Sequence, residues 1–366
     1  MAFSGRMGVE AALVGGTLVT GDIAIADGRV AEVGLSSAKG TGIAAPGLVD
    51  LQVNGFAGVD FFSADADGYR RAGEALLACG VIAYQPTFIT SHEEELIAAL
   101  HEVPRDGAAP RILGAHLEGP FIAPERLGAH PADARRDPDR ALMQRLLDAG
   151  PVSHVTLAPE LPGAYDLVDL LRARGVTVSC GHSDATAVEA RAAFAHGLKT
   201  VTHIFNAMRP IVAREPGLAG AALVSADVVI QVILDGIHLA DETARLVWQS
   251  AAGRVAVVSD AIAAAGVGNG SYTLAGIDLE VENGVARRAD GVLAGSTVPI
   301  IGAVRNLVAL GATVEAALAA GSEVPARIAG RPQLGTLAPG SPADVIVLDD
   351  RLEVVRVLVD GADALP

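Results

Sequence analysis

Short apolar runs recur along this chain at a regular spacing, and this repeat constrains the fold more than any other feature. The stretches between the runs are rich in Ala, Leu, Arg and Glu and place apolar residues at helical spacing. Strands that alternate with helices in this way indicate βα units around a parallel sheet. The candidate strands cover residues 48–53, 81–87, 112–117, 154–158, 177–180, 200–203, 229–234 and 255–259.

Eight parallel strands with crossover helices can close into a barrel. We therefore predict an α/β fold with a (β/α)8 TIM-type barrel over residues 47–335. Residues 271–295 interrupt the repeat with alternating apolar positions and the turn pairs Asn283-Gly284 and Asp290-Gly291. Such pairs are typical of tight hairpin turns, so this segment is predicted to be a β-hairpin insertion after the eighth strand.

The two ends of the chain have a different texture. Residues 11–35 alternate short Val, Ile and Leu runs with the turn pairs Gly15-Gly16 and Asp27-Gly28, which predicts small antiparallel hairpins. Residues 343–361 show the same pattern of short apolar runs. We expect both ends, residues 1–46 plus 336–366, to form one small β-sandwich domain beside the barrel.

Charge and hydropathy exclude several classes of partner. A net charge of −16 is unsuited to a broad nucleic-acid or anionic-membrane surface. Mean hydropathy is +0.40, yet charged, Pro or Gly residues interrupt every apolar stretch before the ~20 residues that a span requires. The first residues lack the apolar run of a secretion signal, and Cys79 and Cys180 are predicted to be reduced thiols. We therefore expect a cytoplasmic globular protein that binds no nucleic acid or membrane.

Unusual polar residues gather where the predicted strands end. This rim of the barrel is where barrel enzymes place their active sites. A single histidine after a strand is most often a structural group, but agreement among six strands favours a common site. The residues in question are Gln52, Asn54, Glu118, His182, His203, His238 and Asp260.

Three of these side chains form a metal-ligand set. Glu118, His182 and His203 supply one carboxylate and two imidazoles, which suits Zn²⁺ or a similar divalent ion with one position open for water. Water on such an ion ionises near neutral pH. Asp260 could accept the proton of that water and deliver it to a leaving amine. Alone, Asp260 could equally be a helix N-cap.

The chain also resembles a known family through seven motifs. THIFNAM and REPGLAG are the most diagnostic pair, and the resemblance runs along nearly the whole chain. The set resembles the N-acetylglucosamine-6-phosphate deacetylases, a family of the amidohydrolase superfamily. The motifs are APGLVDLQVNG, HLEGPF, GHSDA, THIFNAM, REPGLAG, LDGIHL and VSDA.

This resemblance implies an enzyme and assigns roles to the rim residues. The family combines a barrel with a small β-sandwich, is usually a homodimer, and hydrolyses N-acetyl-D-glucosamine 6-phosphate to acetate and D-glucosamine 6-phosphate. It implies Glu118, His182 and His203 as metal ligands and a metal-bound water as the nucleophile. It further implies Asp260 as the general base and acid, and His238 as a substrate-binding group that polarises the acetamide carbonyl.

The first strand indicates how many metal ions to expect. Many amidohydrolases carry His-x-His there for a second metal, whereas this chain has Gln52 and Asn54 at those positions. Amides are poor ligands for Zn²⁺, so one divalent metal per chain is expected, with Gln52 donating to the site water. Zinc is preferred from the resemblance, and Fe²⁺ or Co²⁺ remain alternatives.

The phosphorylated sugar needs contacts of its own. Asn206 and the backbone at Ala207 could donate hydrogen bonds to the phosphate, and Arg214 could clamp it with two parallel bonds. The resemblance implies that Arg214 reaches the partner's site across a homodimer. It also implies that His130 faces the substrate and that the turn at Ser296 lies over the sugar.

Other functions stay open at this point. The chain could be an amidohydrolase that acts on a different N-acetylated amino sugar or on a cyclic amide. It could also be a catalytically inactive barrel that serves as a scaffold, although the intact set of Glu118, His182, His203 and Asp260 argues against this.

Overall fold

A parallel barrel forms the body of the molecule, as predicted. The computed structural model describes residues 3–36, 40–105 and 109–365. Neighbouring barrel strands pair in parallel in the order in which they occur in the sequence. They are β7 (Leu48–Val53), β10 (Val81–Ile89), β12 (Ala115–Glu118), β13 (Val152–Leu157), β14 (Thr177–Cys180), β15 (Thr200–Val201), β16 (Val229–Ile233) and β17 (Val255–Val258).

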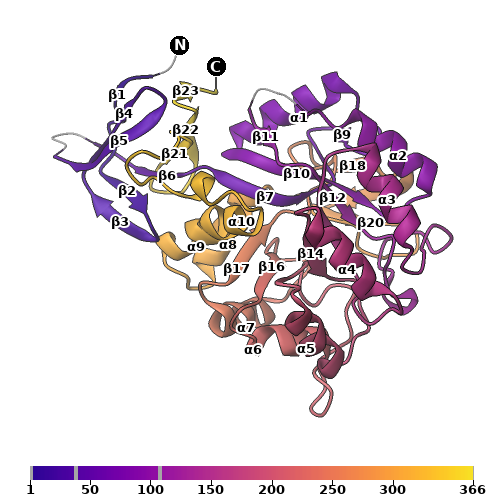
Figure 1. The fold of residues 1–366 in the computed structure, drawn as a ribbon. Coiled ribbons are helices and arrows are strands. Elements are labelled where there is room, and N and C mark those ends of the chain that lie inside the picture. Colours follow the sequence, from indigo (N-terminus) through magenta and orange to yellow (C-terminus); the bar gives the residue numbers. More distant parts are fainter. Residues whose placement is uncertain (1–2, 37–39, 106–108, 366) are drawn as a thin grey trace.

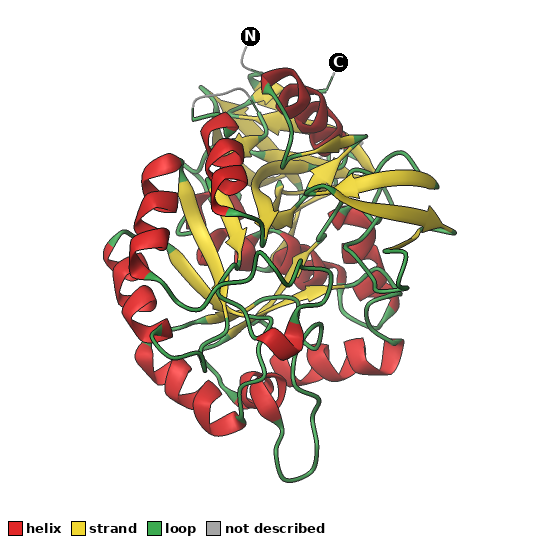
Figure 2. Ribbon diagram, turned by 90° about the vertical axis from the view of Figure 1, so that its right-hand side faces the viewer, coloured by secondary structure: helices red, strands yellow, loops and turns green. Residues whose placement is uncertain are grey.

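Helices cover the outside of the barrel (Figures 1 and 2). Their buried faces consist mainly of Ala, Leu and Val, which pack on the outward-facing strand residues to form the main core. They are α1 (Ala66–Ala78), α2 (Glu93–Glu102), α3 (Arg140–Ala149), α4 (Ala164–Ala173), α5 (Ala187–His196), α6 (Gly217–Val224), α7 (Asp241–Ala251), α8 (Ile300–Ala309), α9 (Val314–Gly321), α10 (Glu323–Ile328) and η2 (Pro332–Gly335). The short helix η1 (Pro124–Arg126) lies in the loop after β12 and has no buried residue.

The barrel closes between its first and last strands. Val53 forms a parallel bridge with Ala261, and the Asp260 amide donates to the Gln52 carbonyl at 3.0 Å. A buried carboxylate spans the same seam, because Asp50 Oδ1 accepts from the Ser259 amide at 3.1 Å. A short ribbon follows β7, formed by β8 (Gly55–Phe56) and β9 (Val59–Asp60).

The third predicted strand is divided in two. Residues 112–117 were expected to be continuous, whereas β11 (Arg111–Ile112) pairs with β10 and β12 starts at Ala115. Gly114 lies between them with φ +99°, and a Cβ at that position would lie 2.6 Å from the Pro151 carbonyl oxygen. A residue in this left-handed region ends one strand before the next begins.

The two ends of the chain meet in a pair of small sheets (Figure 1). The six-stranded sheet has the order β23-β22-β21-β6-β2-β3, and the three-stranded sheet has the order β1-β4-β5. The strands are β1 (Gly5–Arg6), β2 (Ala11–Val14), β3 (Thr17–Thr20), β4 (Asp22–Ala26), β5 (Arg29–Leu35), β6 (Ile43–Pro46), β21 (Val345–Leu348), β22 (Val354–Val359) and β23 (Ala362–Asp363).

Alternation along the six-stranded sheet gives it two apolar faces. Ala44 and Val345 face the three-stranded sheet and form a second core with Ile23 and Ile25. Their strand neighbours, such as Ala45 and Ile346, belong to the main core beside the barrel. The sheet therefore joins the small domain to the barrel. The exact domain limits near residues 46 and 335 stay predictions.

The insertion after the eighth barrel strand is a three-stranded antiparallel sheet. It contains β18 (Gly270–Leu274), β19 (Ile277–Glu282) and β20 (Val285–Arg287). The Asn283-Gly284 turn joins β19 and β20 with both residues at positive φ, as such a pair predicts. Leu274 and Val281 pack with Ile89 and Ile262, which fixes this sheet over the end of the barrel.

Two observations bear on the expected environment of the protein. Among the helices formed by the described residues, none combines the length and the apolar character needed to cross a membrane. Cys79 and Cys180 are both free thiols, with Cys180 fully buried.

Candidate active site

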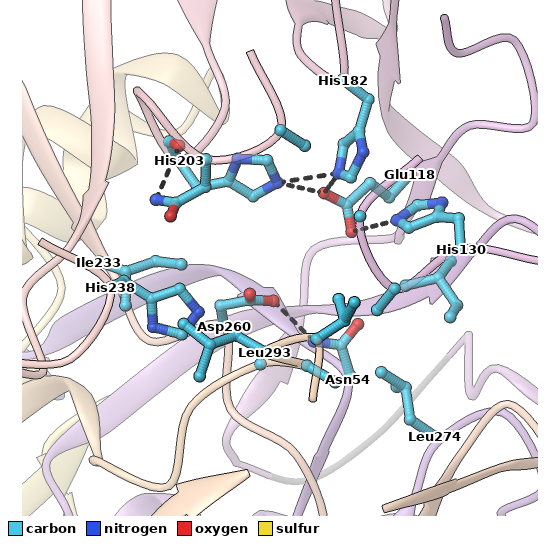
Figure 3. Close-up of a pocket in the computed structure, with 18 residues that line it drawn as sticks. Asn54, Glu118, His130, His182, His203, Ile233, His238, Asp260, Leu274 and Leu293 are labelled. Carbon is cyan, nitrogen blue, oxygen red and sulfur yellow. Dashed lines mark hydrogen bonds and ion pairs between the residues drawn. The ribbon is translucent and has the colours of Figure 1, made fainter. Parts of the chain in front are cut away.

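A cavity of about 240 Å³ opens at the carboxyl ends of the barrel strands (Figure 3). Most of the residues predicted from the rim pattern line it, and so do residues of the insertion. The polar residues of its lining are Asn54, Glu118, His130, His182, His203, Asn206, His238 and Asp260, and Ala207 lies among the remaining lining residues.

The proposed metal ligands converge at one point. Glu118 Oε1 lies 3.1 Å from His182 Nε2 and 2.6 Å from His203 Nε2, and the two imidazole nitrogens are 3.2 Å apart. A tetrahedral zinc ion with ligand bonds of about 2.0–2.1 Å would separate its ligand atoms by roughly 3.3 Å. The two distances to His182 Nε2 are close to this value, and the shorter distance between Glu118 and His203 is that of a hydrogen bond.

The hydrogen-bonding state of His182 supports the same interpretation. His182 Nδ1 donates to the Arg126 carbonyl at 2.9 Å, which leaves Nε2 with a free lone pair toward Glu118 and His203. A carbonyl partner of this kind orients a metal-binding histidine. Electron-rich atoms that face one another so closely in a buried site need a cation or a proton between them, so these residues fit a divalent metal.

His130 lies beside this set in a different state. The Thr90 amide donates to His130 Nδ1 at 3.3 Å, so a neutral ring carries its proton on Nε2, which lies 3.6 Å from Glu118 Oε2. Burial, and then the charge of His182, lower the pKa of His130 to about 4. Glu118, His130 and His182 could also group around an ion. Because the neutral ring carries its proton on the Nε2 that faces Glu118, His130 does not act as a metal ligand in this arrangement.

The electrostatics of the cluster favour positive charge at its centre. Burial raises the pKa of Glu118, but the charge of His203 and the neighbouring rings of His130 and His182 outweigh it, so this pKa lies well below its usual value. Burial lowers the pKa of His203, yet the charge of Glu118 and their hydrogen bond produce a net rise. The negative charge that favours the charged form of His203 would also attract a metal ion.

Asp260 lies across the cavity with one oxygen already engaged. Asn54 Nδ2 donates to Asp260 Oδ1 at 2.8 Å. Burial, and next the negative charge of Glu118, raise the pKa of Asp260 to about 6. A carboxyl group with a pKa near neutrality can both accept and return a proton.

His238 is held by a carboxylate that precedes it in the same loop. His238 Nδ1 donates to Asp235 Oδ2 at 2.8 Å, and Asp235 Oδ1 accepts from the amides of Ile237 and His238 at 2.9 Å. Burial raises the pKa of Asp235, but these bonds lower it to about 2. Asp235 therefore stays ionised and fixes the orientation of the His238 ring.

Three site residues turn into the cavity through an uncommon backbone conformation. His182, His203 and Asp260 have φ values of 47°, 28° and 50°, in the left-handed region. Each lies two residues after the last residue of its strand. Residues other than glycine rarely adopt this region, and such residues are concentrated at functional sites.

The insertion forms the apolar side of the cavity. Leu274 belongs to β18 and Leu293 follows β20, and both line the cavity together with Ile89 (Figure 3). Apolar residues, most of them from the insertion, therefore face the polar groups at the ends of the barrel strands. The pattern resembles a small-molecule site, in which apolar walls surround a few converging polar groups.

Three predicted substrate-binding residues lie outside the cavity lining. Gln52 is fully buried inside the barrel, and Arg214 is exposed. Ser296 is buried, and its backbone donates to the Asp260 carbonyl at 2.8 Å and accepts from Ile262 at 3.1 Å. Asn206 lines the cavity, but its Nδ2 donates to carbonyls of its own turn. The substrate contacts of all four residues, the three outside the lining and Asn206, stay predictions.

Comparison with known proteins places this site in a family. The model of the Amidohydrolase family matches residues 43–362. This chain belongs to the amidohydrolase family. Its likeness to characterised members extends over almost the whole chain. The N-acetylglucosamine-6-phosphate deacetylase of Rattus norvegicus is 36% identical over 95% of this chain and 92% of its own length.

A second relative and a solved structure narrow the group within the amidohydrolases. The N-acetylgalactosamine-6-phosphate deacetylase of Escherichia coli O157:H7 is 36% identical over 86% of each chain. A mutant of the Mycobacterium smegmatis N-acetyl-D-glucosamine-6-phosphate deacetylase, solved in complex with N-acetyl-D-glucosamine-6-phosphate, superimposes with a TM-score of 0.94. It is 35% identical and covers 99% of this chain and 100% of its own.

Two residues of this amidohydrolase site were not assigned a role from the sequence. Asn54 was noted on the rim, but its bond to Asp260 joins positions far apart in the chain. The role of Asp235 could have been predicted, because an aspartate three residues before a loop histidine can accept from the ring and from the amide of that histidine. The Arg126 carbonyl had no signal, since any residue type supplies a carbonyl.

Proposed function

We propose that this amidohydrolase removes the acetyl group of N-acetyl-D-glucosamine 6-phosphate and releases D-glucosamine 6-phosphate and acetate. The observation that carries the proposal is the convergence of Glu118, His182 and His203 opposite Asp260 in one cavity. Relatives named for this reaction, including one in complex with this sugar phosphate, support the choice of substrate.

Glu118, His182 and His203 would hold one divalent ion, with zinc preferred to iron or cobalt. When bound, such an ion acts as a Lewis acid that lowers the pKa of water to near neutrality. Of the two Asp260 oxygens, Asn54 occupies Oδ1, which leaves the other to exchange a proton. Asp260 would take the proton of the attacking water and pass it to the departing amine.

His238 would stabilise the charge that develops on the acetamide oxygen. Its Nδ1 proton is committed to Asp235, so donation from Nε2 into the cavity requires the doubly protonated ring. The ionised Asp235 supports that state. A preorganised donor of this type stabilises the transition state.

The phosphate contacts would come from the loop after β15 and from a second copy of the chain. Asn206 and Ala207 lie at the cavity, whereas the exposed Arg214 would bind phosphate by reaching the site of a second copy of the chain. The proposal therefore includes a homodimer. A cytoplasmic location agrees with two free thiols and stays part of the proposal.

A second candidate substrate has a specific observation behind it. The Escherichia coli relative is named for the galactosamine epimer and is as similar in identity as the rat enzyme. Purified protein of known metal content should therefore be incubated with both acetylated 6-phosphates and with unphosphorylated N-acetylglucosamine. Acetate release chiefly from the glucosamine 6-phosphate supports the proposal. Faster release from its epimer would assign the second function, and release from none would reject both.

A further inference from the structure

Two arginines and one aspartate join three loops at the carboxyl end of the barrel. Arg126 donates to Asp184 Oδ1 from Nε at 2.8 Å and from Nη2 at 2.6 Å. Arg209 donates from Nη2 to Asp184 Oδ2 and from Nε to the Asp184 carbonyl at 2.7 Å. We call these three residues the Asp184 clamp. Each carboxylate oxygen of Asp184 has its own guanidinium, and the pairs are only partly exposed.

One end of the clamp leads to a proposed metal ligand. The carbonyl of Arg126 accepts from His182 Nδ1, so the residue that binds Asp184 with its side chain also orients His182 with its backbone. A second hydrogen bond joins the same two loops, because the Ala123 amide donates to the His182 carbonyl at 2.9 Å. Movement of Arg126 would therefore move the only carbonyl that selects the His182 tautomer among the described residues.

The other end leads to the proposed phosphate-binding segment. Arg209 follows Asn206 and Ala207 and precedes the exposed stretch that contains Arg214. The Ser183 amide donates to the Ala207 carbonyl at 3.2 Å, and the Arg209 amide donates to the Ser183 carbonyl at 3.1 Å. These bonds hold the segment beside Asp184.

Glu160 fixes the centre of the clamp to a fourth loop. Its Oε1 accepts from the Asp184 amide at 2.6 Å, and its Oε2 accepts from Ser183 Oγ at 2.7 Å. Within the described part of the chain, neither Arg126 nor Arg209 lines the cavity. Their guanidinium groups are bound to Asp184, so they act on the loops and not on the substrate.

We propose that Asp184 is a positioning residue that holds His182 for metal binding and holds the segment from Asn206 to Arg214 for phosphate binding. The first role requires only that His182 binds a metal. The second role rests on the proposed function. Loss of the carbonyl partner of a metal-binding histidine typically lowers metal affinity about 10–100-fold. Loss of the Arg209 contact should instead affect recognition of the substrate.

The first role is tested by zinc affinity, measured by competition with a chelator and independently of catalysis. Asp184→Asn and Arg126→Ala should each weaken zinc binding by about tenfold or more, and Arg126→Lys should restore part of the loss. Arg356→Ala is the matched control, because Arg356 pairs with Asp363 through two bonds in the small domain. Folded Asp184→Asn and Arg126→Ala proteins with affinity within about twofold of the wild type would overturn this role.

The second role is tested with Arg209→Ala, which leaves the bonds between Arg126 and Asp184 in place. We expect nearly unchanged zinc affinity and a KM for the 6-phosphate substrate raised by about tenfold, with turnover of the free sugar unchanged. An unchanged KM would overturn the second role. If Asp184→Asn does not fold, the two arginine variants decide both roles. A wild type that releases no acetate rejects the proposed function, while the zinc measurements still decide the first role.

Discussion

The left-handed backbone at His182, His203 and Asp260 explains how residues that follow three different strands come to point into one cavity. Each such residue costs about 1–2 kcal/mol relative to ordinary backbone. The surrounding structure maintains the conformation through bonds such as the one from the Asp260 amide to Gln52. The same geometry decides which substitutions are informative, because Asn tolerates this region better than most residues do.

Asp260→Asn should therefore keep the fold and the metal content but lower turnover at least ~10²-fold. The amide can still accept from Asn54 through its oxygen, yet it cannot carry a proton. Acetate release and zinc content should be measured on the same preparation. Turnover near that of the wild type would assign the proton transfer to another group.

Asp235 and His238 should behave as one unit. Asp235→Asn and His238→Asn are each expected to lower turnover by about tenfold, less than Asp260→Asn, because both remove charge stabilisation and leave the attacking water activated. The double variant should be no slower than the slower single variant. Additive losses in this double-mutant cycle would show that the two residues act separately.

Metal content should be about one equivalent per chain. One three-residue ligand set converges in the described structure, and Gln52 and Asn54 occupy the positions where a second metal would need histidines. His182→Ala and His203→Ala should lose metal and activity together. Elemental analysis that finds two tightly held equivalents, or full occupancy in both variants, would contradict this ligand assignment.

Sequence patterns anticipated much of this site, because residues after parallel strands must meet at one end of a barrel. Glu118, His182, His203, His238 and Asp260 all line the cavity for this reason. Partners that depend on loop conformation escaped prediction. The Arg126 carbonyl and the internal bonds of Asn206 follow from φ and ψ values that the residue types do not specify.

At the scale of elements, the apolar repeat was sufficient to locate all eight barrel strands. β7 and β14 have the predicted bounds, since strong turn signals flank them. The division between β11 and β12 was not predicted, because Gly114 fits either a strand interior or a break, and the approach of Pro151 decides between them. The insertion contains a third strand, β20, which pairs with β19, whereas a two-stranded hairpin alone is only marginally stable.

The seam between β7 and β17 contains a buried acid that should make stability depend on pH. Burial raises the pKa of Asp50 to about 7, although bonds from Ser259 and Gln52 lower it. Between about pH 4 and pH 7 the folded protein holds a proton that the unfolded chain has lost, so unfolding free energy falls as pH rises. Below and above this window Asp50 contributes no further pH dependence.

Asp50→Asn should remove this contribution. Relative to the wild type, the variant should gain a few kcal/mol of stability as pH rises from about 4 to about 7. Urea denaturation of both proteins at several pH values measures the difference. The prediction fails if the two stability profiles run parallel across this range.

At the scale of the whole molecule, Arg214 tests whether two copies share their active sites. Arg214→Ala should weaken catalysis on the 6-phosphate substrate by roughly 2–5 kcal/mol and barely change slow turnover of the free sugar. The reason is that the free sugar has no dianion to lose its partner. Equal losses on both sugars would exclude phosphate binding by Arg214.

Mixing Arg214→Ala chains with Asp260→Asn chains should restore part of the activity. If Arg214 serves the partner's site, each heterodimer contains one site with both residues intact. Heterodimer formation should be verified with two affinity tags. Proven heterodimers without recovered activity would place Arg214 in the site of its own chain.

The pairing of β6 with β21 also affects the protein while it is being made. About 300 residues separate these neighbours, so at roughly 5–20 residues per second β6 waits about 15–60 s for its partner to leave the ribosome. During that time the nascent chain presents an open strand edge and an uncovered apolar face, both of which favour aggregation. Cells that synthesise this protein at high levels should therefore depend on chaperones that bind early, before the small sheet can close.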